Sequence, residues 1–88
     1  MINKELADKL IQKYCPSVKL TITDRYGKEG LYLQSSNEII ITEDWTIAGL
    51  LHEITHAKLY LEQDRVGHDG VFADTFTKIV SEVFEKSS

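Results

Sequence analysis

Residues 50–61 read Leu-Leu-His-Glu-Ile-Thr-His-Ala-Lys-Leu-Tyr-Leu and form the centre of the helix around which we expect this chain to fold. The helix is predicted to begin after Thr42 or Asp44, because either side chain can accept hydrogen bonds from the amides of a first turn. It is predicted to end near Gln63, before the break at Gly67. Apolar residues at spacings of three and four give it one face for a core: Ile47, Leu50, Leu51, Ile54, Ala57 and Leu61.

The segments before this helix predict another helix and a small sheet. Lys4–Tyr14 repeats apolar residues at helical spacing, and Asn3 can serve as its N-cap. Residues 18–23 alternate apolar and polar side chains, which is the pattern of a half-buried strand. Residues 31–34 and 38–42 are two further short strands, so we expect a three-stranded sheet, antiparallel or mixed and arranged as a meander, with a helix against it.

A last helix is predicted after Asp69. Its apolar residues again recur at helical spacing and by default belong to the core: Val71, Phe72, Phe76, Ile79, Val80, Val83 and Phe84. Together the elements predict an α+β fold for one domain that spans residues 1–88. A chain this short buries only roughly 60% of the surface that its unfolded form exposes, so a bound metal ion would also stabilise the fold.

Composition narrows the setting and the partners. Cys15 is the only cysteine, so no disulfide can form within the chain, and a reducing compartment suits it. Neither a signal peptide nor a membrane-length apolar run is present, so we expect a cytoplasmic protein without a membrane partner. The formal charge of −4 disfavours charge-driven binding to nucleic acid. Five basic residues near one another in sequence could form a basic face, but we interpret them as solvated surface charges: Lys9, Lys13, Lys19, Arg25 and Lys28.

The spacing of His52, Glu53 and His56 indicates a metal site. Residues one helical turn apart lie on the same side of a helix, so the two imidazoles can converge on one ion. Two neutral imidazoles one helical turn apart, with a carboxylate on the residue directly after the first, are the arrangement of a hydrolytic zinc site. Glu53 is expected to act as a general base rather than as a ligand, by taking a proton from a water that Zn²⁺ has acidified.

His68 is the best candidate for the third ligand that a catalytic zinc site needs. Gly67 and Gly70 flank it and give the backbone freedom to turn His68 towards the helix that it has just left. The acidic alternatives are more simply surface charges or helix caps: Asp74, Glu62 and Asp69.

Residues 50–76 resemble the SprT-like family of zinc metallopeptidases, which includes Spartan. The match rests on the helix motif of residues 52–56 and on the segment His-Asp-Gly-Val-Phe at residues 68–72, where the family has a ligand histidine followed by an aromatic residue four positions later. The resemblance implies a minimal zincin-like catalytic core, with His52, His56 and His68 as zinc ligands and Glu53 as the catalytic acid/base. A protein or peptide would be the substrate.

Two departures from the family pattern affect the prediction. Asp69 stands where the family has glycine after the third histidine, and it could cap the last helix or hydrogen-bond a ligand. The chain also shows neither the cysteine-rich zinc ribbon nor the basic tail through which relatives engage DNA. Association with DNA-bound proteins is therefore a weak implication of the resemblance.

Several alternatives remain open at this stage. Zinc could hold together a binding or decoy module without catalysis. The chain could also be related to phage and mobile-element peptidases that cleave repressors and find a third ligand elsewhere. Substrate could pair along residues 38–42 if that strand is an exposed edge. Three tyrosines are candidates for steadying an oxyanion, and the sequence does not choose among them: Tyr60, Tyr26 and Tyr32.

Overall fold

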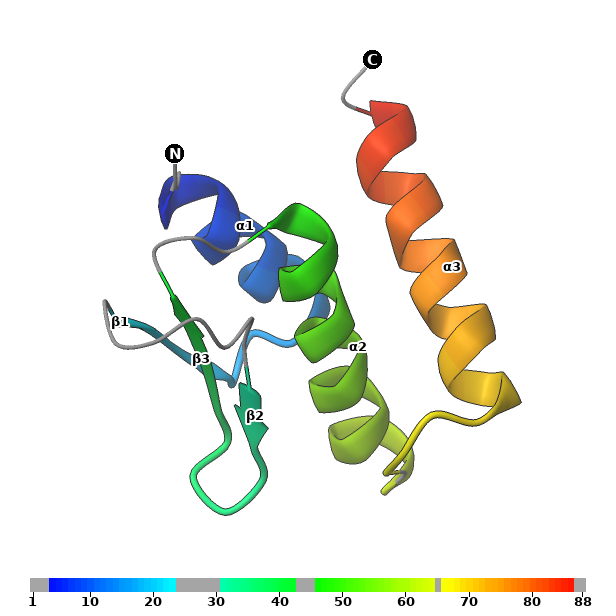
Figure 1. The fold of residues 1–88 in the computed structure, drawn as a ribbon, viewed down its shortest axis with the longest axis horizontal. Helices are drawn as coiled ribbons and strands as arrows, with labels where there is room; N and C mark the ends of the chain where they lie inside the picture. Colours follow the sequence, from blue (N-terminus) through cyan, green and yellow to red (C-terminus); the bar gives the residue numbers. More distant parts are fainter. Residues whose placement is uncertain (1–3, 24–30, 43–45, 65, 87–88) are drawn as a thin grey trace.

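The helices and strands of the protein follow the predicted order. The computed structural model describes residues 4–23, 31–42, 46–64 and 66–86. Its elements are α1 (Lys4–Tyr14), β1 (Lys19–Thr23), β2 (Leu31–Leu33), β3 (Glu38–Thr42), α2 (Ile47–Gln63) and α3 (Gly70–Lys86). The predicted α+β class, with a three-stranded mixed sheet, is confirmed (Figure 1). The proposed cap Asn3 lies outside the described residues.

The strand order of the sheet is β1-β3-β2, so the predicted meander is wrong. β3 lies in the centre, parallel to β1 and antiparallel to β2. The reason is the composition of β3, which contains the consecutive residues Ile39, Ile40 and Ile41. A strand that carries a continuous apolar run is better covered on both sides than exposed at an edge. Ile39 and Ile41 are accordingly fully buried, whereas β1 and β2 have no fully buried residue.

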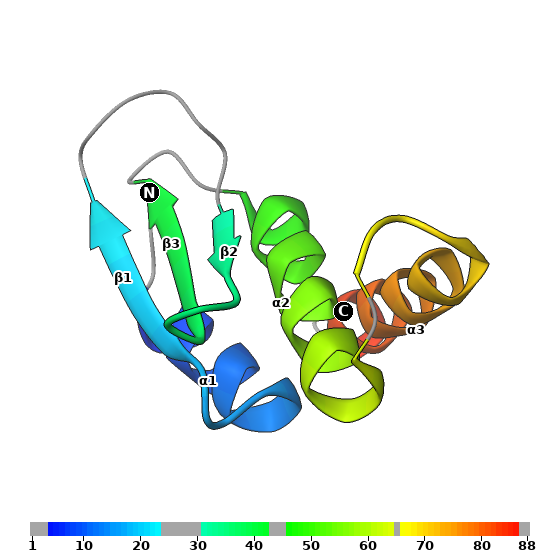
Figure 2. The same ribbon diagram turned by 90° about the horizontal axis from the view of Figure 1, so that it is seen from below.

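Helix α2 lies between the sheet and α3 (Figures 1 and 2). It contacts α1, β2, β3 and α3. The buried core combines residues of α1, the segment after it, β3, α2 and α3: Ala7, Leu10, Ile11, Cys15, Val18, Ile39, Ile41, Leu50, Leu51, Ile54, Ala57 and Ile79. Burial raises the pKa of the Cys15 thiol to about 12, which keeps this side chain protonated and inert. No helix in the described ranges has the length and apolar character needed to cross a membrane.

The first residue of α2 differs from the prediction. Thr46 is the N-cap, and its Oγ1 accepts a hydrogen bond from the Gly49 N–H at 3.0 Å. Thr42 is the last residue of β3 and is buried there, so it cannot cap the helix. Asp44 lies outside the described residues. The predicted end at Gln63 is confirmed, and Asp64 closes the helix in the left-handed conformation.

Two predicted core residues are exposed instead. Leu61 in the last part of α2 is 44% exposed, and Phe84 near the end of α3 is 48% exposed. Leu59, which the single predicted stripe leaves out, is buried. Because α3 packs against α2 in addition to the sheet and α1, burial along α2 is not confined to one stripe.

The cap at Thr46 gives the first testable prediction. Replacing Thr46 with Ala removes the acceptor for the Gly49 N–H and should lower the free energy of unfolding by about 1 kcal/mol. Urea denaturation at fixed metal concentration measures the change. The matched control is Thr77→Ala, at an exposed position inside α3, which should be neutral or slightly stabilising. Equal destabilisation by both substitutions would contradict the role of Thr46 as cap.

Candidate metal centre

Three histidine side chains, two from α2 and one from the loop that follows it, converge on one point. His52 and His56 come from α2, and their Nε2 atoms lie 3.2 Å apart. His68 comes from the loop that follows α2, and its Nε2 atom lies 3.0 Å from each of the other two. The structure therefore brings together the three residues that the sequence singled out, in a group that can hold a metal ion.

The loop between α2 and α3 returns the chain towards α2 over a few residues. Asp64, with φ of 54°, ends the helix, and Gly67, with φ of 89°, adopts a conformation that a side chain would strain. Asp69 then caps the start of α3, because its Oδ1 accepts a hydrogen bond from the Phe72 N–H at 2.9 Å. The predicted capping role of Asp69 is confirmed. Gly70 is simply the first residue of α3 and does not make the turn.

The chemistry of the three imidazoles fits a cation. Burial, together with the neighbouring His52 and His68, lowers the pKa of His56 to about 4, so His56 is neutral near pH 7. Each Nε2 atom either carries a proton or presents a lone pair, so at least one of the three pairs at 3.0–3.2 Å must place two protons or two lone pairs against each other. A bound cation would remove this conflict. Nitrogens bound tetrahedrally to zinc at about 2.0–2.1 Å are separated by roughly 3.3–3.4 Å, which is close to the observed spacing.

The acidic alternatives for the third ligand lie outside this group. Glu62 is paired with Lys58 at 2.5 Å on an exposed part of α2. Asp69 caps α3. Asp74 is exposed on α3. His68 is therefore the side chain that completes the cluster among the described residues.

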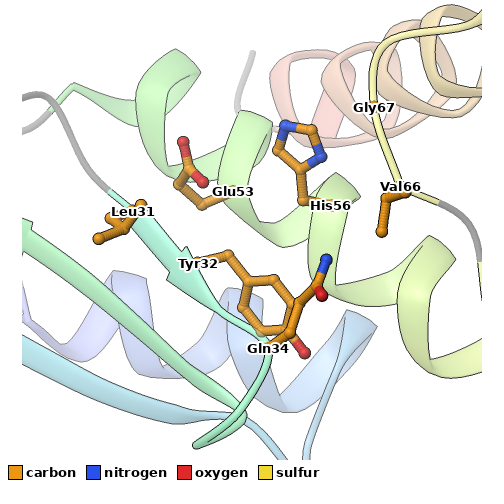
Figure 3. Close-up of a pocket in the computed structure, with 7 residues that line it drawn as sticks. All are labelled: Leu31, Tyr32, Gln34, Glu53, His56, Val66 and Gly67. Atoms are coloured by element: carbon orange, nitrogen blue, oxygen red, sulfur yellow. The ribbon is translucent and has the colours of Figure 1, made fainter.

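Glu53 lies beside the cluster in a half-buried position. Burial raises the pKa of its carboxyl, while a hydrogen bond from the Tyr32 backbone N–H and the proximity of His68 act in the opposite direction. Glu53 and His56 line one pocket of about 220 Å³ between β2 and the loop after α2 (Figure 3). The other residues around this pocket are Leu31, Tyr32, Gln34, Val66 and Gly67.

Of the three tyrosines considered for an oxyanion, Tyr32 lines this pocket. Its hydroxyl donates a hydrogen bond to Asn37 Oδ1 at 2.9 Å, in the turn between β2 and β3. Burial raises the pKa of Tyr32, so the hydroxyl keeps its proton. The Tyr60 ring packs beside it, with the two ring centroids 6.2 Å apart. Tyr26 lies outside the described residues, and an oxyanion role for any of the three remains a prediction.

Phe72 is a neighbour of the site that helical periodicity assigned only to the core. Its ring centroid lies 4.6 Å from that of His56, 4.8 Å from that of His68 and 5.1 Å from that of His52. Phe72 is 6% exposed. The available signal was its position four residues after His68, in the first turn of the helix that follows this histidine.

Comparison with protein families, curated proteins and solved structures found no match.

The cluster predicts that the protein binds one equivalent of a divalent metal ion, for which zinc is the probe. His68→Ala should weaken this binding by about 100-fold or more, since even partners outside the ligand set are worth roughly 10–100-fold. His68 is exposed, so the substitution should leave the fold intact. Chelator competition gives the affinity, and metal analysis gives the stoichiometry. Asp74→Asn is the matched control and should bind zinc like the wild type. Unchanged affinity in His68→Ala would exclude His68 as a ligand.

Proposed function

We propose that this protein is a zinc-dependent peptidase in which His52, His56 and His68 hold the ion and Glu53 is the general base. The observation that carries the proposal is the placement of Glu53 and His56 on one pocket beside the histidine cluster. A half-buried carboxylate with a raised pKa next to three converging imidazoles is typical of a functional site rather than of a solvated surface charge. The proposal agrees with the family resemblance of residues 50–76.

A zinc ion bound here would lower the pKa of a water in its open position and polarise the carbonyl of a peptide bond. The chain itself would manage the proton. Glu53 would accept the proton from the attacking water on its carboxylate and pass it to the leaving amine. The Tyr32 N–H would hold that carboxylate in place, because it hydrogen-bonds Glu53 and lies on the strand that borders the pocket.

The cleft for a substrate lies along β2 rather than along β3. Pairing of a substrate along residues 38–42 required this strand to be an exposed edge, and β3 is instead paired on both sides. β2 is an outer strand of the described sheet, and its Tyr32 N–H is directed towards Glu53 on α2. We propose that a peptide segment lies in an extended conformation beside β2, in the space that leads to Glu53 and His56.

The pocket favours an apolar side chain next to the scissile bond. Leu31 is 52% exposed and Val66 is 62% exposed, and these two aliphatic residues lie on opposite sides of the pocket (Figure 3). Covering both by a substrate side chain would remove apolar surface from water. Among the lining residues, Glu53 is the one acid and neither lysine nor arginine is present, so the pocket offers an acidic side chain no permanently charged partner.

A structural ion is the second candidate function, and one observation favours it. His68 precedes α3 whereas His52 and His56 belong to α2, so an ion held by the three would tie the two helices together. Such an ion would stabilise the fold whether or not the chain cleaves peptides. The role of Glu53 separates the two candidates.

Replacing Glu53 with Gln should lower the rate of hydrolysis of an unfolded protein substrate by about 10²–10⁴-fold while one equivalent of zinc is retained. The reason is that the amide keeps the shape of the side chain but cannot accept the proton. Glu62→Gln, on the exposed side of the same helix, is the matched control and should keep full activity. A Glu53→Gln preparation as active as the wild type would remove the proposed base.

Val66→Asp should lower cleavage of peptides that place leucine next to the scissile bond, by about tenfold relative to the wild type, because the new charge faces the apolar side chain. Leu61→Asp controls for the loss of an exposed aliphatic residue outside the pocket. Cleavage rates over a set of peptides that differ at that one residue give the comparison. An equal effect of both substitutions would show that Val66 does not line the substrate site.

A further inference from the structure

Phe72 contacts all three histidines of the cluster at once. The centroid of its ring lies between 4.6 and 5.1 Å from the centroid of each imidazole. The ring planes are inclined by 62° to His52, 41° to His56 and 79° to His68. Inclined contacts at this separation are the favoured geometry between aromatic rings. A single side chain is therefore packed against every proposed ligand of the ion.

We propose that Phe72 is a positioning residue that holds the three imidazoles in their ion-binding orientation, an inference that rests on the metal site of the proposed function. The terminal torsion of a histidine is broad, so the ring can turn its Nε2 atom away unless neighbours prevent it. Phe72 limits this rotation for all three rings together. All three rings must be fixed for the Nε2 atoms to stay within 3.2 Å of one another. A side chain that contacts all three therefore affects the geometry of the site more than a neighbour of one ring does.

Phe72 is itself held from two directions. Its backbone N–H donates a hydrogen bond to Asp69 Oδ1 at 2.9 Å, next to the ligand candidate His68. Its ring is stacked on Phe76, with a centroid separation of 6.0 Å and an angle of 14° between the planes. The ring is 6% exposed, so water does not separate it from the imidazoles. The segment 68–72 thus carries both the third imidazole and the side chain that packs against it.

Phe76 provides a matched comparison, because it belongs to the same stack but contacts only His52, at 6.0 Å, among the three histidines. We expect Phe72→Leu to weaken zinc binding by about 10–100-fold, the range for groups that orient metal ligands. Phe76→Leu should change the affinity by less than about threefold although it also removes a ring from α3. Zinc affinity is measured by chelator competition, and the melting temperature of each variant reports general destabilisation.

A spectroscopic measurement separates positioning from stability. With Co²⁺ in place of zinc, Phe72→Leu should shift or weaken the visible absorption bands that report the ligand geometry, whereas Phe76→Leu should leave them unchanged. Phe72→Tyr, which retains the flat ring, should restore the affinity and the spectrum. If Phe72→Leu does not fold, Phe72→Met fills the same volume without a flat ring and takes its place in the comparison.

Wild-type affinity and an unchanged cobalt spectrum in Phe72→Leu would overturn the inference and leave the metal site standing. So would equal losses in Phe72→Leu and Phe76→Leu, because the effect would then follow core packing. Failure of the wild type to bind zinc would instead overturn the metal site itself.

Discussion

The site depends on holding three imidazole nitrogens within 3.2 Å of one another although they come from two segments of the chain. The helix supplies two of them without further cost, because residues one turn apart lie on the same side. The third requires the chain to leave α2 and return. The left-handed residue Asp64, the positive φ of Gly67 and the cap at Asp69 make that return short. The loop is thus as much a part of the site as the helix motif is.

Helix α2 can serve both the core and the site because its faces have different neighbours. Ile54 and Ala57 are fully buried, whereas Glu53 and His56, each one residue earlier, are half-buried around the pocket. A step of about 100° per residue moves adjacent side chains onto different faces. Because α2 is central, β2 lies on one side of it and α3 on the other (Figure 2). The position of the pocket follows from this packing.

Local patterns predicted a large part of this structure. Apolar spacing predicted the bounds of α1, and the helix motif with His68 predicted the cluster, because both depend on residues that are near in sequence. The strand order depends on which strand is paired on both sides. A meander, in which the strands pair in the order of the chain, would place β2 in the centre, whereas β3 lies there. The run of three isoleucines in β3 was the signal that could have corrected it.

Exposure of single residues was less predictable for a related reason. Leu61 and Phe84 continue apolar stripes but are exposed, because periodicity predicts which face of a helix is apolar and not how far along the helix the covering elements extend. Thr42 and Thr46 are the same residue type and equally suited to capping, so the sequence did not show which of them caps α2. The structure places Thr42 in β3 and Thr46 at the cap. Phe72 was predicted as core, which is correct, but its contact with three histidines depends on how α3 packs against α2.

The attachment of α3 links the fold to the metal centre. Two side chains of α3 are buried among the described residues: Ile79 in the main core and Phe72 against the histidines. Tyr14 adds a hydrogen bond from α1 to Glu82 at 2.8 Å. An ion held through His68 would stabilise the docked helix by roughly 2.7 kcal/mol at a concentration 100 times its dissociation constant. If the ion also serves the proposed catalysis, its loss would still loosen α3, so a catalytic and a stabilising role of one ion are not exclusive. Glu53 distinguishes the two roles, because it lines the pocket but lies outside the group that can hold the ion. It would be needed for catalysis and not for stabilisation by the ion.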